Sequence, residues 1–250
     1  MSDKLVIMFP DLRGEGATGA FGRELLQCYA DDEHTHLIPV INGVELKEIE
    51  RISYGLHPKF EPCPFDFGPG QLNALVAGYR YALAHYCKAT IVRLDTNEHP
   101  VAMIPTLVQR VRDHGGMAIG NVRFSPKTIV PGSPDEFFHV VCRTLYETAT
   151  HGALPLSGAH GFQAFAPDVC AEVLEAALLI IERANRDGGP PLGWGLCGAM
   201  AMGAVAIGTP VYLADLLATQ PRNRPAEKVA AQLQDFIRTV LVAVTLYDLD

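Results

Sequence analysis

Short apolar runs alternate with amphipathic helical stripes in the first half of the chain, and this alternation restricts the possible folds more than any other feature. Residues 5–9, 37–41 and 90–94 have the length and apolar character of buried strands. Apolar residues recur at three- and four-residue spacing over 72–83 and 101–111, which predicts helices there. Strands separated by helices of this length predict βαβ units and a mostly parallel sheet.

The second half of the chain is less regular but continues the same class of structure. Its patterns predict two further strands and three helices, at 117–122 and 209–213 and at 136–149, 168–186 and 226–247. We therefore expect an α/β chain with a single domain, in which helices flank a mostly parallel central sheet.

Composition excludes several classes of protein. The 250 residues are 48% hydrophobic and 19% charged, which suits one domain with a substantial core. The formal net charge of −8 disfavours a nucleic-acid partner, because an acidic surface repels phosphate backbones. The apolar stretches are too short to predict a membrane span. The six cysteines form no CxxC pair and are typical of reduced core thiols, so we expect a cytoplasmic protein.

An acidic segment follows the third predicted strand. It contains Asp95, Asn97 and Glu98, and Pro100 then begins the next helix. Mg²⁺ typically binds one or two carboxylates together with substrate phosphates, so this segment is a candidate site for Mg²⁺ or Mn²⁺. A simpler alternative is that Asp95 caps the following helix.

A glycine-rich turn precedes the helix predicted over 72–83. Its Gly68 and Gly70 would let backbone N–H groups approach an anion at the start of the helix, where Gln71 lies. The alternative is an ordinary turn, since glycine is common in turns of every kind.

Together the two segments resemble the family 2-type glycosyltransferases of the GT-A fold, and the dolichyl-phosphate mannose synthase-like branch is the most similar. The resemblance covers roughly residues 4–215. The matching positions are Gly68, Gly70, Ala74, Gly78, Ala82, Asp95, Asn97, His99, Pro100, Ile104, Pro105, Leu107 and Val108. It implies a GT-A-like domain over 1–215 and a C-terminal helical extension over 216–250, packed on the domain or on a partner.

The resemblance also implies a nucleotide site at the ends of the first strands. Pro10 and Asp11 follow the first strand, and Asn42 and Glu45 follow the second. Gly68, Gly70 and Gln71 would complete the cofactor-binding set, and Asp95 and Asn97 would hold the metal. This chain departs from the family pattern in three places: it lacks the family's Asp after the second strand, it has Asn97 in place of a second motif Asp, and it has Gln71 in place of Lys or Arg.

The remaining candidates concern the acceptor and the chemistry. His160 and Glu98 are candidate catalytic residues, since inverting transfer needs a base near the acceptor hydroxyl. Arg123 would meet a phosphate and Trp194 would stack on a sugar or base. A lone His, Arg or Trp is more often structural, and that alternative stays open for each.

The predicted function is transfer of a sugar from a nucleotide-diphosphate sugar to an unknown acceptor. Two alternatives remain. A sugar-nucleotidyltransferase would also use a parallel sheet and a glycine-rich turn, and a non-catalytic GT-A-fold binding or scaffold protein would explain the weakened metal motif. A homo-oligomer is possible, because residues 236–247 have enough apolar surface to bury against a partner.

Overall fold

The computed structural model describes residues 4–63, 71–95, 99–123, 128–156, 161–186, 195–217 and 224–249. Contacts divide the chain into two compact units. Unit 1 comprises Met1–Gly115 and Phe162–Ala171, and unit 2 comprises Gly116–Gly161 and Glu172–Asp250.

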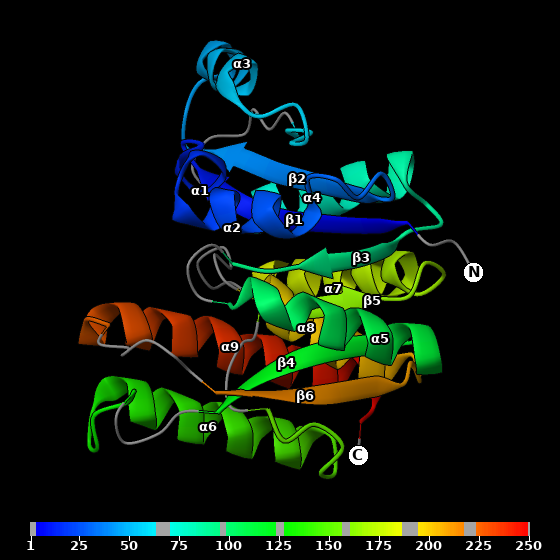
Figure 1. Ribbon diagram of the computed structural model, residues 1–250. Coiled ribbons are helices and arrows are strands. Elements are labelled where there is room, and N and C mark those ends of the chain that lie inside the picture. Colours follow the sequence, from blue (N-terminus) through cyan, green and yellow to red (C-terminus); the bar gives the residue numbers. More distant parts are fainter. Residues whose placement is uncertain are drawn as a thin grey trace. The chain divides into compact units, whose positions relative to one another are not determined.

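The sheet of unit 1 is mostly parallel, as predicted. It contains β1 (Leu5–Leu12), β2 (Thr35–Asn42), β3 (Thr90–Arg93) and β5 (Gln163–Phe165) in the order β2-β1-β3-β5. β1 pairs in parallel with β2 and with β3, whereas β5 is antiparallel to β3 (Figure 1). The sequence did not predict β5, because three residues are too few to show a period.

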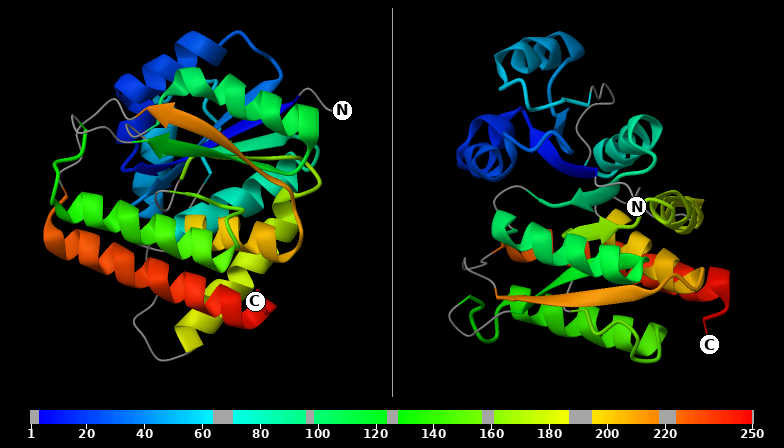
Figure 2. Two further views of the ribbon diagram at one scale, coloured as in Figure 1. Left: turned by 90° about the horizontal axis from the view of Figure 1, so that it is seen from below. Right: turned by 45° about the vertical axis from the view of Figure 1, so that its right-hand side comes forward.

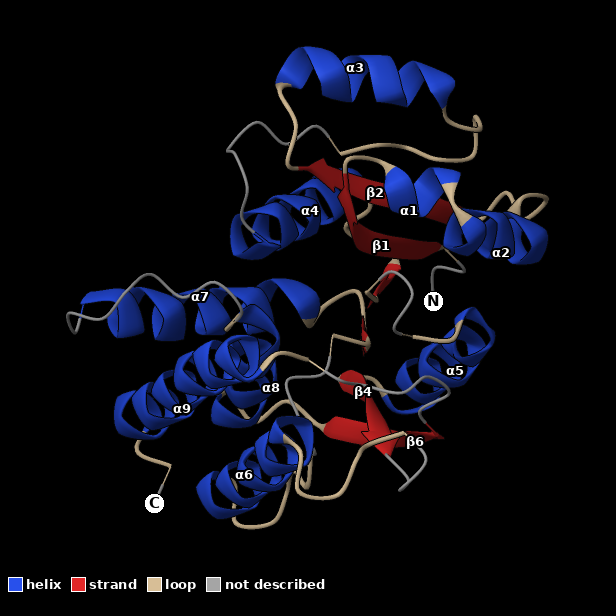
Figure 3. Cartoon of the chain, turned by 90° about the vertical axis from the view of Figure 1, so that its left-hand side faces the viewer, coloured by secondary structure: helices blue, strands red, loops and turns tan. Residues whose placement is uncertain are grey.

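Helices cover both faces of β1 and β2 in unit 1. α4 (Gln71–His85) lies on one face, and α1 (Glu15–Thr18) and α2 (Ala20–Tyr29) lie on the other (Figure 3). The core between these layers is largely apolar and includes Phe9, whose ring meets that of Phe21 edge to face at 5.1 Å. The helices of 72–83 and 101–111 are confirmed, the second as η1 (Val101–Met103) followed by α5 (Ile104–His114).

Two helices of unit 1, α1 and α3 (Leu46–Gly55), were not predicted. α3 buries only Ile49 among its residues. Leu46, Ile49 and Ile52 nevertheless recur at three-residue spacing, so the sequence did contain a signal for this helix.

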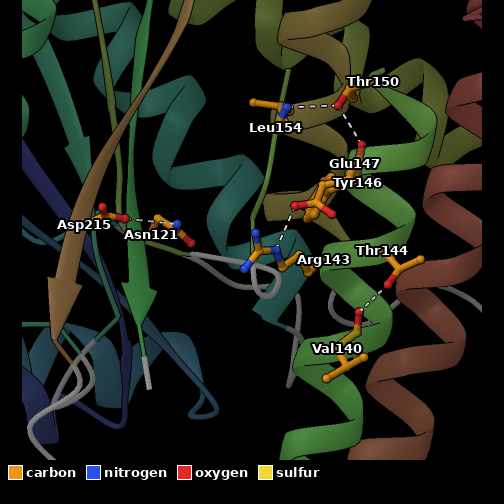
Figure 4. Close-up of polar contacts among 9 residues, drawn as sticks. All are labelled: Asn121, Val140, Arg143, Thr144, Tyr146, Glu147, Thr150, Leu154 and Asp215. Carbon is orange, nitrogen blue, oxygen red and sulfur yellow. Dashed lines mark hydrogen bonds and ion pairs between the residues drawn. The ribbon is translucent and has the colours of Figure 1, made fainter. Parts of the chain in front are cut away.

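The described residues of unit 2 form a parallel strand pair and four helices. β4 (Met117–Arg123) pairs with β6 (Val211–Leu217), and the two run side by side (Figure 2). In the middle of this pair Asn121 donates a hydrogen bond of 3.3 Å to Asp215, and Figure 4 shows the two side chains facing each other.

Two helices of unit 2, α6 (Pro134–Ala149) and α9 (Ala226–Tyr247), run side by side in the same direction (Figures 1 and 2). They meet through Tyr146 and Phe236, whose rings lie 4.8 Å apart. At their amino-terminal ends the carboxylate of Asp135 accepts hydrogen bonds from the backbone and guanidinium N–H groups of Arg224.

The other helices of unit 2 are α7 (Cys170–Arg186, within unit 2 from Glu172) and α8 (Leu196–Ala206). On α7 the guanidinium of Arg186 forms an ion pair with the carboxylate of Glu182, one helical turn earlier. α8 was not predicted as a helix. Nine of its residues are buried, so it is apolar on all sides and has no amphipathic period.

Among the described helices, α9 is the one long and apolar enough to cross a membrane. It carries Asp235 and Arg238 near its middle, and the guanidinium of Arg238 donates to the carbonyl of Ala184 on α7. Its buried residues Val229, Phe236 and Val240 belong to the core of unit 2. We interpret α9 as a helix of this unit, and the division of the chain at residue 215 stays a prediction.

Candidate active site

The candidate site lies where three parallel strands of unit 1 end. Leu12 at the end of β1 is in register with Asn42 at the end of β2, and Met8 is in register with Arg93 at the end of β3. Ligands of open parallel sheets bind beyond these carboxyl ends. The pairing therefore brings the segments after Pro10, Asn42 and Arg93 to one edge of the sheet.

Asp11 shapes the turn after β1. It is fully buried, and its two carboxylate oxygens accept the backbone N–H groups of Gly16 at 2.7 Å and Ala17 at 2.9 Å. Burial raises the pKa of this carboxyl, although the two hydrogen bonds partly offset the rise. Arg13 and Gly14 turn the chain with φ angles of 57° and 75°. Contact of Asp11 with a nucleotide stays a prediction, and its observed contacts hold the turn in shape.

Asn42, the last residue of β2, forms a hydrogen bond with the same turn. Its carbonyl oxygen accepts the backbone N–H of Arg13 at 2.9 Å. Its side chain is buried, and within the described part of the chain Oδ1 has no hydrogen-bond partner. A buried acceptor at a ligand-binding edge is suited to an N–H or O–H donor of a bound molecule.

Glu45 lies further out, before α3. It is exposed, and its side chain makes no capping hydrogen bond to the helix. The carboxylate does not cap α3, which is compatible with the predicted role of Glu45 in nucleotide binding.

Asp95 follows β3 and is held by two neighbours. The guanidinium of Arg93 donates to Oδ1 of Asp95, and the backbone N–H of Asp95 donates to Nδ1 of His99 at 3.0 Å. Arg93 is only 1% exposed and His99 only 6%. The His99 ring stacks on Phe162 at 5.2 Å, so the second of these neighbours is itself fixed by packing.

Comparison with solved structures identifies the fold around this edge. One similar structure, described as a mycobacterial protein, is 18% identical and covers 96% of this chain and 74% of its own, with a TM-score of 0.63. Another is glucosyl-3-phosphoglycerate synthase from Mycobacterium tuberculosis in complex with Mn²⁺, UDP and phosphoglyceric acid. It is also 18% identical and covers 96% of this chain and 78% of its own, with a TM-score of 0.62. The fold is that of the GT-A glycosyltransferases.

A third similar structure is the same synthase with Mn²⁺, UDP-glucose and phosphoglyceric acid, at 19% identity and a TM-score of 0.57. The alignment covers 97% of this chain and 80% of the synthase chain. No protein-family profile and no curated protein sequence matches the chain. The likeness therefore lies in the GT-A fold, and the roles of individual residues have to be argued from the geometry.

Asp95 is compatible with a metal of the kind that a GT-A fold implies. The described residues contain no group of three His, Cys, Asp or Glu side chains arranged to hold a metal. A hard divalent cation that arrives with a diphosphate needs no such group, because one carboxylate and the phosphate oxygens are a common ligand set for Mg²⁺. The Asp95 carboxylate is 20% exposed at this edge of the sheet, so it is accessible to such a cation.

Several predicted site residues lie outside the described residues, namely Gly68, Gly70, Asn97, Glu98, His160 and Trp194. For two others the structure describes the backbone: Gln71 is the first residue of α4 and Arg123 the last of β4. The roles given to all eight stay predictions.

Two residues at the site, Arg93 and His99, were not among the predicted site residues. A sequence signal existed for Arg93, since it is a charged residue within an otherwise apolar strand and lies two positions before Asp95. Side chains two apart on a strand share a face. Nothing in the sequence indicates that the ring of His99 accepts a hydrogen bond from the backbone N–H of Asp95.

Proposed function

We propose that this chain is a glycosyltransferase that moves a sugar from a nucleotide-diphosphate sugar to an acceptor, with assistance from Mg²⁺ or Mn²⁺. The single observation that carries the proposal is the placement of Asp95, held by Arg93 and His99, at the sheet edge where β1 and β2 also end. The GT-A fold of the chain supports it.

Different described residues at this edge of the sheet would bind different parts of the donor. The unpartnered Oδ1 of Asn42 would accept a hydrogen bond from the nucleotide. The turn that Asp11 stabilises would border the ribose and diphosphate, and Glu45 would reach the ribose hydroxyls. Asp95 would hold the divalent cation. When bound, this cation neutralises the charge that develops on the leaving diphosphate, which lowers the barrier to transfer.

For the donor we propose a UDP-sugar, and for the acceptor a small phosphorylated acid. The support is that the synthase of similar fold was solved with UDP-glucose and phosphoglyceric acid. A polyprenyl phosphate acceptor, as the dolichyl-phosphate mannose synthase-like resemblance predicts, is the alternative. Arg123 would meet the acceptor phosphate in either case, and Trp194 would stack on the sugar.

The proton acceptor for the attacking hydroxyl is proposed to be His160 or Glu98, which are the notable titratable candidates of the sequence. A cytoplasmic setting is part of the same proposal. None of the six cysteines forms a disulfide in the structure, which agrees with the reduced thiols that such a setting maintains.

Product analysis tests the function. The chain is incubated with UDP-glucose or GDP-mannose, Mn²⁺ and either 3-phosphoglycerate or dolichyl phosphate, and the released nucleotide is identified. A glycosyltransferase releases a nucleoside diphosphate together with a glycosylated acceptor. Release of pyrophosphate from a sugar phosphate and a nucleoside triphosphate would indicate a nucleotidyltransferase instead.

The variant Asp95→Asn gives the matching residue-level test. Because it removes the described carboxylate that is proposed to hold the metal, we expect a loss of at least about 100-fold in kcat/KM, since removal of one oriented electrostatic group at a reacting centre typically costs that much. Asp113→Asn is the matched control, because Asp113 is an exposed carboxylate on α5 that pairs with Gln109. Equal activity in the two variants would refute the assignment of Asp95.

A further inference from the structure

The segment that contains α3 is attached to unit 1 without hydrogen bonds of its own backbone. We call residues 43–56 the α3 strap; they follow Asn42 at the end of β2, and α3 lies next to β2, the outer strand of the sheet (Figures 1 and 3). The backbone hydrogen bonds described for the strap all join residues within it. Its described side-chain hydrogen bonds do the same, between Arg51 and Glu48 and between Ser53 and Ile49.

Apolar side chains make the described contacts between the α3 strap and the rest of unit 1. Of the residues of α3, all of which the structure describes, only Ile49 is buried. Ile52 rests on the turn after β1, since a Cβ atom at Gly14 would lie 2.5 Å from its Cγ2. Segments with few buried apolar groups open locally at a free energy well below that of global unfolding. We therefore expect the strap to open as a unit while the sheet stays folded.

The surfaces on which the strap rests belong to the candidate donor site. Gly14 has a φ of 75° and lies in the turn whose N–H groups Asp11 accepts. Gly43, with a φ of 76°, follows Asn42 directly, and a Cβ atom there would lie 2.6 Å from Cδ1 of Leu12. Glycine permits both the positive φ and the close approach. A ligand that orders the turn after β1 and the end of β2 would therefore fix both supports of the strap.

We propose that the α3 strap is a lid, which opens in the nucleotide-free chain and is held closed by a nucleoside diphosphate bound beside Asn42 and the turn after β1. The proposal rests on the function proposed above and adds a conformational step to donor binding. A ligand shifts such an equilibrium only if it binds one state more tightly than the other. The contact between Ile52 and Gly14 provides this difference, because a turn ordered by the nucleotide presents a fixed surface to the closed strap. Closure of a lid also excludes water from a bound donor.

Hydrogen exchange followed by mass spectrometry tests the proposal without any assay of activity. In the nucleotide-free chain the amides of α3 exchange at least about 100-fold faster than those of residues 75–85 in α4, because local opening costs less than global unfolding. This part of α4 is the reference because it buries Leu75, Tyr79 and Ala82. UDP at a saturating concentration slows the exchange of α3 by at least about tenfold, which lies within the usual range of coupling between a ligand and a conformational change. Calorimetry establishes the saturating concentration, and GDP replaces UDP if it binds more tightly.

Two alanine variants of α3 separate the contact with Gly14 from the stability of the helix. Ile52→Ala removes the side chain that rests on the turn, so the exchange of α3 in the nucleotide-free chain becomes at least about tenfold faster. Tyr54→Ala is the matched control, because Tyr54 is 91% exposed, and it leaves this exchange as slow as in the wild type. Both substitutions raise the intrinsic helix propensity, so faster exchange in Ile52→Ala reports the lost contact. Circular dichroism checks that each variant is folded, and Ile52→Val, with an expected increase of at least about twofold, replaces Ile52→Ala if the latter does not fold.

Three results would overturn the proposal: exchange in α3 as slow as in α4, exchange in α3 that bound UDP or GDP leaves unchanged, or equal exchange in the folded Ile52 variant and in Tyr54→Ala. These failures are distinct from failure of the proposed function. A chain that transfers sugar while bound nucleotide leaves the exchange of α3 unchanged contradicts the lid alone. A chain that transfers no sugar, but whose α3 is slowed by bound nucleotide, supports the lid and contradicts the transferase. A chain that binds no nucleotide in calorimetry contradicts both.

Discussion

Gly78 permits α4 to lie close against the sheet of unit 1, and its replacement by alanine tests this packing. A Cβ atom at position 78 would lie 2.6 Å from Cγ2 of Val40 on β2 and 2.8 Å from Cε of Met8 on β1. Carbon atoms attract each other best at about 3.5–4.0 Å, so both contacts are strongly repulsive. The Met8 methyl group is the end of a flexible chain and moves easily, whereas Val40 is β-branched and stiff at χ1.

Two opposing effects decide the size of the change. Alanine is about 1 kcal/mol more favourable than glycine in the interior of a helix. Overpacking of a well-packed core costs about 1–3 kcal/mol. Because the Val40 contact cannot relax without moving α4 or β2, we expect overpacking to win and Gly78→Ala to lower the free energy of unfolding by about 1–2 kcal/mol.

Gly55→Ala is the control, and urea unfolding followed by circular dichroism is the assay. Gly55 is the last residue of α3, and a Cβ atom there would meet nothing within 4 Å. It should therefore leave the free energy of unfolding unchanged or raise it by up to about 1 kcal/mol. If Gly78→Ala were as stable as Gly55→Ala, the close approach of α4 to β1 and β2 would be wrong.

Two more predictions concern the start of β4 and the pair of Asp135 and Arg224. Gly115 and Gly116 both have positive φ, but a Cβ atom at 116 would lie 2.3 Å from the carbonyl oxygen of Pro210, while one at 115 would meet nothing within 4 Å. Thermal denaturation should therefore show a clearly larger loss of stability for Gly116→Ala than for Gly115→Ala. Equal losses of stability would contradict the observed position of the start of β4 beside Pro210. Burial raises the pKa of the Asp135 carboxyl, but the hydrogen bonds from Arg224 outweigh it and hold the pKa below its ordinary value. This pair therefore contributes stability that is complete above about pH 4 and is lost as the pH falls through the pKa of the folded state. Asp135→Asn should lower stability at pH 7 by about 3 kcal/mol and flatten the acid limb of the stability curve, and an unchanged acid limb would refute the pairing.

The regular elements of the first half were predictable from the sequence because each buries one face. The strand predicted at 90–94 is β3, and the helix predicted over 101–111 continues to His114, where Gly115, with a φ of 71°, suits a residue just past a helix. Two of the missed elements have physical reasons. α8 is buried on all sides, and β5 has three residues.

The site was predictable in outline and not in detail. Asp95 follows an apolar strand, and parallel pairing of β1, β2 and β3 then places it at the same edge as Asn42. The supports of Asp95 depend on tertiary structure, since the return of His99 to its backbone and the burial of Arg93 follow from packing. The sequence also gave no indication that Asp11 would use both its oxygens within its own turn.

A crystal structure of the chain with UDP and Mn²⁺ tests the central claim most directly, because the anomalous signal of Mn²⁺ locates the metal independently of the fitted atoms. The account predicts an anomalous peak about 2.2 Å from a carboxylate oxygen of Asp95, within the usual range of metal–oxygen distances, with the diphosphate bound to the same ion. It also predicts the nucleoside beside Asn42. A Mn²⁺ peak away from Asp95, or UDP bound far from the carboxyl ends of β1, β2 and β3, would contradict it.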